Sequence, residues 1–361
     1  MVDSTIKNLI LYYEQKGVTA QNISFLTSAF FITVTSSFYL GNEIPPNRRY
    51  ILDFITRHLD LILQADPNGV GTRNTVLVLC AMTMPHLYEK VVNTILAQAQ
   101  TSRTETDIKI LPDHIRNLAW SPLARKINYM PESLFLRVLA VTPNEVQALS
   151  AFAQYVSRAG YSLETTRSFY SRIEKHPDLG SSEICGLMNA YAKSNLPIQE
   201  RKMAIQRLQK NPTGGHLMPP CTLIVGLIKP DLFSNLIGLA DQYVSNQSHE
   251  PYVRGGAILV YGLSDLPFAQ RKAKIESVLR SNQFSNESMQ ALMPYLIDGF
   301  GITNIEQYME ILRIVATYRQ IEDESQIGYV VNFLNTTKSL SDAQKAEIRR
   351  LFHLPKEVSM N

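Results

Sequence analysis

Apolar residues in the second half of the chain recur at helical spacing between short polar breaks. In residues 162–174, for example, Leu163, Phe169 and Ile173 fall on one side of a helix. A cluster of Asn, Pro, Thr and Gly at residues 211–215 separates one such segment from the next. Successive helix starts lie about 16 to 20 residues apart, so the pattern predicts pairs of short helices of about 35 residues each.

Two of these predicted hairpins share a sequence frame. Residues 191–205 and 261–275 both follow Y-x-x-S-(N/D)-L-P-x-x-x-R-K-x-x-I without a gap. Pro197 and Pro267 are equivalent in the two copies, so the offset is 70 residues, the difference between 267 and 197. Because proline cannot continue a helix, we expect the Leu-Pro pair to set the turn. The Tyr and Ile of the frame are expected to pack between helices.

The repeat predicts an all-α fold of stacked antiparallel helical hairpins that form an α-solenoid-like superhelix. A single short hairpin cannot bury its apolar side alone, so stacked neighbours supply a continuous core. A weaker third copy at residues 342–348 aligns Lys345 with Lys272 at an offset of 73. Strand patterns are weak. The apolar run at residues 75–84 could be a buried strand, but its helical neighbours favour a core helix.

The first half of the chain is less regular. A polar stretch at residues 101–107 lacks large apolar side chains and is the best candidate for a linker or an exposed loop. We therefore expect an irregular helical N-terminal part at residues 1–130 and a hairpin-repeat region at residues 131–361, with one continuous domain as the alternative. Amphipathic helices are predicted in the first part at residues 6–15, 49–64 and 86–100.

One segment raises the question of a membrane. Residues 21–41 contain no charged side chain, and a membrane-spanning helix needs about 20 predominantly apolar residues. Serines and threonines dilute this segment, however, so a buried helix is favoured and no membrane insertion is expected. The N-terminus also lacks a basic region followed by an apolar run, so no secretory signal is predicted.

Composition fits a folded protein with little specialised charge. The 361 residues are 45% hydrophobic and 19% charged, and the net charge is +3. A dedicated nucleic-acid binder usually has a larger basic excess. Three cysteines, Cys80, Cys185 and Cys221, lie far apart and do not suggest a disulfide framework or a zinc site, which predicts a reducing, intracellular compartment.

A search for catalytic or cofactor motifs finds little. The chain lacks a P-loop, and its histidines show no zinc-ligand spacing. Cys221 and His216 are near each other but are too few for a zinc site, and a Cys–His nucleophile has no local support. The acidic residues 322–324 precede a helical segment, where the helix dipole favours them. We therefore expect no cofactor, no metal and no enzymatic activity.

The repeated Arg-Lys pair is the one polar feature with a geometric argument for binding. Equivalent positions of stacked hairpins project along one face, so the pairs predict a spaced row of cations. Such a row could bind an acidic peptide or follow a phosphate backbone. The alternative is that these are solvated helix residues with good helix propensity. The candidate partner-binding residues are Arg201, Lys202, Arg271, Lys272 and Lys345.

The hairpin length resembles that of tetratricopeptide and pentatricopeptide repeats. The sequence Leu-Met-Asn-Ala-Tyr-Ala-Lys at residues 187–193 resembles the second helix of octotricopeptide-type RNA-binding repeats. This resemblance covers at most residues 162–352. The Trp, Leu-Gly and Tyr pattern of tetratricopeptide repeats is missing, and Trp120 lies outside the repeats, so no family is assigned.

Three functional hypotheses follow from the sequence. The first is a non-enzymatic scaffold that binds a protein or peptide along an extended face. The second is RNA binding along the same face through the Arg-Lys pairs. The third is an enzyme whose residues converge only in the folded chain.

Overall fold

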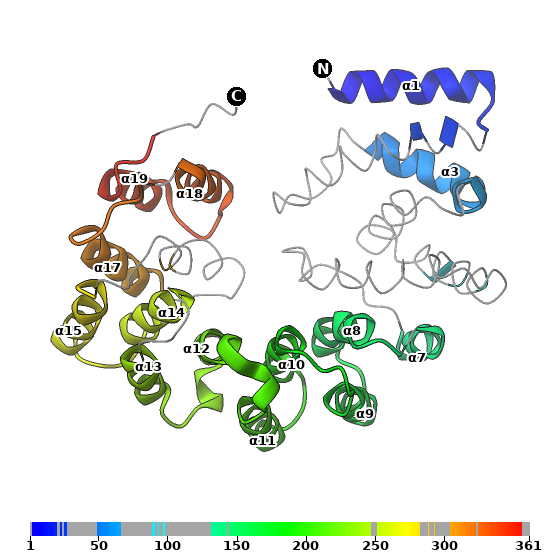
Figure 1. The fold of residues 1–361 in the computed structure, drawn as a ribbon. Coiled ribbons are helices and arrows are strands. Elements are labelled where there is room, and N and C mark those ends of the chain that lie inside the picture. The colour runs from blue at the N-terminus through cyan, green and yellow to red at the C-terminus, as the bar shows by residue number, and fades with distance from the viewer. Residues whose placement is uncertain are drawn as a thin grey trace. The chain divides into compact units, whose positions relative to one another are not determined.

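A computed structural model gives the fold of the chain, and its regular elements are helices throughout the part that it describes (Figure 1). The predicted all-α class is therefore confirmed. Two compact units, Met1–Asp178 and Leu179–Asn361, divide the chain. The described residues are 2–19, 22, 23, 25, 26, 49–65, 89, 90, 93, 97, 131–142, 144–246, 251–281, 288, 292, 304–322 and 324–355.

The predicted boundary near residue 130 remains a prediction. Residues 101–130, including the expected linker at 101–107, lie outside the described part, as do Trp120 and the apolar run at 75–84. Of the predicted helix at 86–100, the structure describes residues 89, 90, 93 and 97, all of them helical.

The first unit contains helices on either side of the residues that the structure leaves undescribed. The predictions for residues 6–15 and 49–64 are confirmed, and Arg57 binds Glu14 across these two helices with an N–O distance of 2.6 Å. The helices are α1 (Val2–Lys16), α3 (Arg49–Ala65), α7 (Glu132–Val141), α8 (Val146–Ala159) and α9 (Leu163–Glu174).

Aromatic side chains join the last three helices of this unit. Phe135 on α7 contacts Phe152 on α8 and Phe169 on α9, with ring centroids 5.7 and 5.8 Å apart. All three rings are buried. Edge-to-face contacts of this kind add to the stability that comes from burying the rings.

The second unit contains the repeated frame. The α-helices whose bounds are given below range from 10 to 13 residues in length, and two 3-10 helices lie among them. The elements are α10 (Ser181–Lys193), α11 (Ile198–Gln209), η3 (Pro212–Leu217), α12 (Met218–Ile228), η4 (Pro230–Leu232), α13 (Leu236–Ser245), α14 (Pro251–Gly262), α15 (Phe268–Leu279), α17 (Ile305–Ala316), α18 (Glu324–Thr336) and α19 (Asp342–Leu351).

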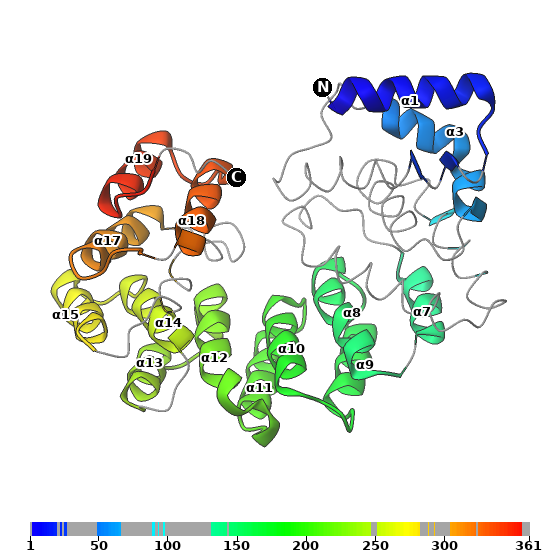
Figure 2. The same cartoon turned by 45° about the horizontal axis from the view of Figure 1, so that its top comes forward.

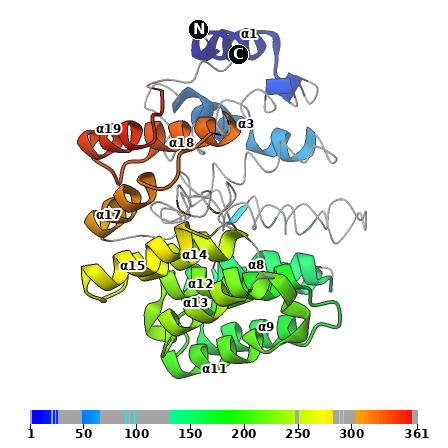
Figure 3. The same cartoon turned by 60° about the vertical axis from the view of Figure 1, so that its left-hand side comes forward.

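Helix α14 is the centre of packing in the second unit. It contacts α12, α13, α15 and α17, and Figures 1 and 2 both show it among these helices. From Val253 to Gly262 every residue of α14 is buried. Two further contacts, α10 with α12 and α17 with α19, continue the packing towards the two ends of the unit. Figure 3 shows α17 beside α15, where these two helices pack together.

A missing side chain allows one of these close approaches. A Cβ atom on Gly262, the last residue of α14, would collide with the side chain of Ile311 on α17. Ile311 is completely buried, so it has little room to move. The glycine therefore sets how closely α14 and α17 pack.

The uncharged segment at residues 21–41 is described at four positions. Of residues 21–41, the structure describes 22, 23, 25 and 26, which are helical, and Ile23 and Leu26 are fully buried. Among the described helices, none has the length and hydropathy that crossing a membrane requires.

Candidate binding surface of the repeated hairpins

The repeated frame produces the same turn twice, between α10 and α11 and between α14 and α15. In each turn the backbone N–H of the serine donates to the tyrosine carbonyl three residues earlier, at 3.2 Å for Ser194 and 3.3 Å for Ser264. The two hydroxyls donate to the same carbonyls, of Tyr191 and Tyr261, at 2.9 and 2.6 Å. These hydroxyls help to satisfy carbonyls at helix ends, which lack partners within the helix.

Proline then starts the second helix in both copies. Pro197 and Pro267 precede the first helical residue with nearly identical φ of −52° and −53° and the same ψ of 143°. Helices α11 and α15 are both 12 residues long. The expected role of the Leu-Pro pair in setting the turn is therefore confirmed.

The arginines of the repeated pair point back to the preceding helix. The Nη1 atom of Arg201 donates to the carbonyl oxygen of Ala192 at 2.9 Å. Arg271 Nη1 donates to the carbonyl oxygen of Gly262, also at 2.9 Å. Both carbonyls lie in the last turn of the first helix of the hairpin, where cations and donors are favoured. We call this repeated bond the arginine clamp.

The second clamp is more deeply buried than the first. Arg271 is 9% exposed and also forms an ion pair of 2.8 Å with Glu310 on α17. Arg201 is partly buried. Each of these two guanidinium groups has a buried Nε atom without a hydrogen-bond partner. The arginines thus serve contacts within the chain.

The lysine is more exposed than the arginine in the second pair, whereas both residues of the first pair are partly buried. Lys272 is exposed, and its Nζ lies 3.8 Å from Glu276 one turn later, while Lys202 is partly buried. Contact of these lysines or of the arginines with a partner remains a prediction. The structure brings each Arg-Lys pair to an equivalent place in its hairpin.

The third predicted copy differs in register. Helix α19 begins after Ser341, whose side chain and that of Gln344 form a capping box in place of the proline. Counted from the helix start, Lys345 corresponds to Arg271, although the sequence frame aligns it with Lys272. Lys345 thus lies one residue earlier in its helix than Lys202 and Lys272 do in theirs. It is partly buried.

Exposed apolar residues accompany the lysines. The first residue of α11 is Ile198, which is 37% exposed, and the first residue of α15 is Phe268, which is 49% exposed. Lys202 and Lys272 follow one turn later on the same helix face. Each second helix thus presents an apolar residue next to a lysine, and sequence reasoning missed the apolar residue because it occupies a variable position of the frame.

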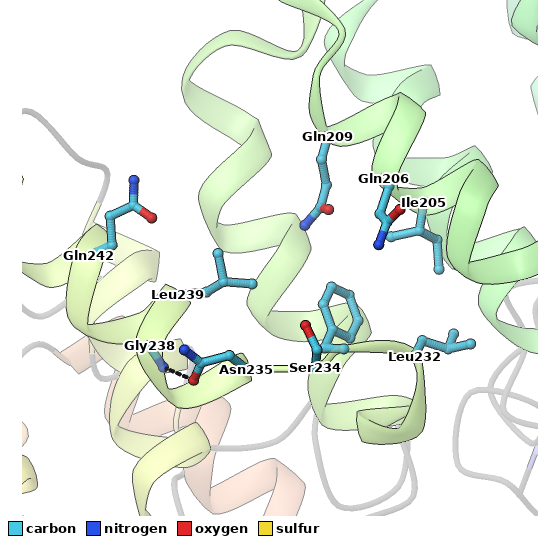
Figure 4. Close-up of a pocket in the computed structure, with 10 residues that line it drawn as sticks. Ile205, Gln206, Gln209, Leu232, Ser234, Asn235, Gly238, Leu239 and Gln242 are labelled. Carbon is cyan, nitrogen blue, oxygen red and sulfur yellow. Dashed lines mark hydrogen bonds between the residues drawn. The ribbon is translucent and has the colours of Figure 1, made fainter. Parts of the chain in front are cut away.

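A groove lies beside the first of these helices. It has a volume of about 270 Å³ and is formed by α11, η4, the segment after η4 and α13 (Figure 4). We call it the α11–α13 groove. Its lining contains no charged side chain. The polar lining residues are Gln206, Gln209, Ser234, Asn235 and Gln242, and the apolar ones include Ile205, Phe233 and Leu239.

Two of the lining amides are held in place by contacts of their own. The Asn235 Oδ1 atom accepts the backbone N–H of Gly238 at 2.8 Å, so this residue caps the start of α13 (Figure 4). Gln209 Nε2 donates to the hydroxyl of Thr222 on α12 at 3.3 Å. Gln206 and Gln242 are exposed at the rim. The groove was not predicted, because its lining comes from separate helices.

Two tyrosines outside the groove have strongly shifted pKa values, and burial is the main cause in both. Burial raises the pKa of Tyr308, whose hydroxyl donates to the carbonyl of Leu292 at 2.8 Å. Burial, followed by the neighbouring Asp241, raises the pKa of Tyr261.

Glu324 is the first residue of α18, which agrees with the expected placement of acidic residues at a helix start. Within the described ranges, no cluster of three His, Cys, Asp or Glu could hold a metal ion.

Comparisons with known proteins suggest no family and no function for this chain. The chain matches no protein-family model, no curated protein and no solved structure. Its function is therefore inferred from its residues and their geometry.

Proposed function

We propose that this protein is a non-enzymatic helical-repeat scaffold that binds an extended peptide of a protein partner. The observation that supports this proposal most is the lining of the α11–α13 groove. Carboxamide groups both donate and accept hydrogen bonds, as the peptide backbone does. Apolar side chains next to them can accommodate apolar side chains of a ligand.

The charge of the groove favours a peptide over a nucleic acid. Binding of RNA depends on neutralising phosphates with Lys and Arg, whereas the groove lining is uncharged. Both arginines of the repeated pairs donate to backbone carbonyls of their own hairpins. RNA binding through the pairs, the alternative hypothesis, would therefore depend mainly on Lys202, Lys272 and Lys345.

The surface outside the groove supports the same proposal. Ile198 with Lys202, and Phe268 with Lys272, form two equivalent pairs of an apolar residue and a cation. A ligand segment with apolar and acidic residues would complement them. We propose that the hairpins stack as a solenoid-like array, so that these pairs lie along one face. The chain of contacts from α10 through α12 and α14 to α17 supports this arrangement.

A displayed library of random linear peptides tests this function. Peptides selected on the full chain should bind wild type, and Gln206→Ala should weaken that binding several-fold because one rim amide is lost. Gln199→Ala is the matched control, since Gln199 is an exposed glutamine of α11 outside the groove.

The salt dependence separates the two hypotheses. Peptide affinity should fall much less steeply with salt than RNA affinity, because the groove lining is uncharged and at most two lysine contacts would be screened. Binding of a single-stranded RNA that falls steeply with salt and is lost in Lys202→Ala and Lys272→Ala would contradict the peptide proposal. Failure to select any peptide that distinguishes Gln206→Ala from Gln199→Ala would also contradict it.

A further inference from the structure

Two cysteines that are distant in sequence meet in the second unit. Cys185 lies on α10 and Cys221 on α12, and these two helices pack together. The Cys185 thiol donates to the carbonyl oxygen of Leu217 at 3.7 Å. Leu217 is four residues before Cys221, and a carbonyl in a helix faces the residue four positions later, so this bond places the Cys185 sulfur beside the turn of α12 that carries Cys221. Both cysteines are free thiols.

Solvent reaches this pair. Cys185 and Cys221 are each partly exposed. A small reagent therefore has access to the pair.

The contact makes the two thiols chemically different. The hydrogen bond from Cys221 lowers the pKa of Cys185, because a donor stabilises the thiolate. The same bond, together with burial, raises the pKa of Cys221 well above its ordinary value. A thiolate is the reactive form of cysteine, so Cys185 is the better nucleophile and Cys221 keeps its proton.

We propose that Cys185 and Cys221 form a reversible disulfide that links α10 to α12, with a hydroperoxide as the oxidant. The Cys185 thiolate attacks one oxygen of hydrogen peroxide and the O–O bond breaks. The released hydroxide takes up a proton to become water. The sulfenic acid so formed on Cys185 is then attacked by the Cys221 sulfur. The S–O bond breaks, a second water leaves with the Cys221 proton, and the S–S bond remains.

The fold favours this product over further oxidation. A sulfenic acid with a thiol in contact condenses with it more readily than it reacts with a second peroxide molecule. Since Cys185 already lies beside the turn that carries Cys221, an approach of the two helices can bring the sulfur atoms to the S–S bond length of about 2.05 Å. Thiol reductants reverse the reaction by attack on the disulfide.

Mass spectrometry of the wild-type chain after treatment with hydrogen peroxide tests this proposal. The expected result is a monomer lighter by two hydrogen atoms, with residues 185 and 221 in one cross-linked pair of peptides, and full recovery of the original mass with dithiothreitol. Cys185→Ser and Cys221→Ser should each lose this product. In Cys221→Ser, one oxygen atom should be added at Cys185, because the resolving thiol is absent.

The same experiment can overturn the proposal. Oxygen addition to both cysteines of wild type without an intrachain cross-link would do so. A cross-link that involves only Cys80, or only a second copy of the chain, would also do so. Because the decisive mass is measured on wild type, it does not depend on whether the serine variants fold.

A second readout is thermal unfolding. A cross-link between residues 185 and 221 restricts the unfolded chain, so the oxidised wild type should melt a few degrees above the reduced protein. An unchanged melting temperature in a fully cross-linked sample would contradict a disulfide that fits the native packing of α10 on α12.

Discussion

Arg201 and Arg271 make the same hydrogen bond in two different hairpins. Each donates from Nη1 to the backbone carbonyl nine residues earlier, at 2.9 Å. The two arginines thus have the same structural role, because each satisfies a carbonyl at the end of the preceding helix. The arginine clamp joins the two helices of a hairpin across their turn.

We predict that Arg271→Met destabilises the fold by about 2–4 kcal/mol, because Glu310 and the carbonyl of Gly262 lose their partner. Arg201→Met should cost less, about 1–2 kcal/mol, because its clamp is less buried. Urea unfolding followed by circular dichroism measures both. Lys272→Met is the control and should stay within about 0.5 kcal/mol of wild type, since Lys272 is exposed. Equal losses in the Arg271 and Lys272 variants would refute the clamp.

Gly262 and Ala192, whose carbonyls accept the clamp bonds, should respond differently to substitution. Gly262→Ala should destabilise by about 1–3 kcal/mol because the new Cβ collides with buried Ile311. Ala192→Gly at the equivalent position should cost about 1–2 kcal/mol through lower helix propensity and the loss of a completely buried methyl group. Thermal or urea unfolding compares the two variants. A stabilised Gly262→Ala protein would show that α14 and α17 can move apart at no cost.

The capping box of α19 provides a third test. Ser341 accepts the backbone N–H of Gln344 at 3.3 Å, and the Gln344 side chain accepts the backbone N–H of Ser341 at 2.9 Å. Ser341→Ala should therefore cost about 1 kcal/mol in urea unfolding. The control is Ser277→Ala, an exposed serine inside α15, which should have a much smaller effect or a slightly stabilising one.

Acid should weaken one contact of the first unit. Glu132 accepts hydrogen bonds from the hydroxyls of Ser162 and Thr165, both at 2.6 Å, and these bonds lower its pKa from the ordinary 4.5. The folded pKa lies below the unfolded one, so the stabilisation is present above pH 4.5 and is lost as pH falls through the folded pKa.

Glu132→Gln should therefore lower stability at pH 7 by about 1 kcal/mol, since the site is largely solvated. The difference from wild type should shrink in acid. Unfolding at pH 7 and in acid measures it, with Glu164→Gln on an exposed part of α9 as the control. A difference that is the same at both pH values would mean that the charge of Glu132 is irrelevant.

Much of the local structure was predictable from sequence. The Tyr and Ile of the frame were expected to be packing positions, and Tyr191, Ile205, Tyr261 and Ile275 are all buried. The turns were predictable because proline restricts its own φ and the residue before it. These features depend on spacing within one hairpin, which a single sequence displays directly.

The arginine clamp, the α11–α13 groove and the cysteine contact were not predicted. A frame of identities shows that Arg271 is equivalent to Arg201, but it does not show which carbonyl lies within reach. The groove requires α13 to lie beside α11. The contact of Cys185 with Cys221 requires α10 to pack on α12, and sequence reasoning had instead considered Cys221 with His216. Long-range packing, rather than local periodicity, decides all three.

The 70-residue offset has a consequence for how this protein can be lengthened. The frame marks the α10–α11 and α14–α15 hairpins, while the α12–α13 hairpin between them is connected through η4 and does not carry it. The frame therefore recurs after four helices, α10 to α13, and each occurrence of it has its own turn and its own internal arginine bond. Graft boundaries placed after residues 210 and 280 would transfer a whole module, whereas cuts at every 35 residues would divide one.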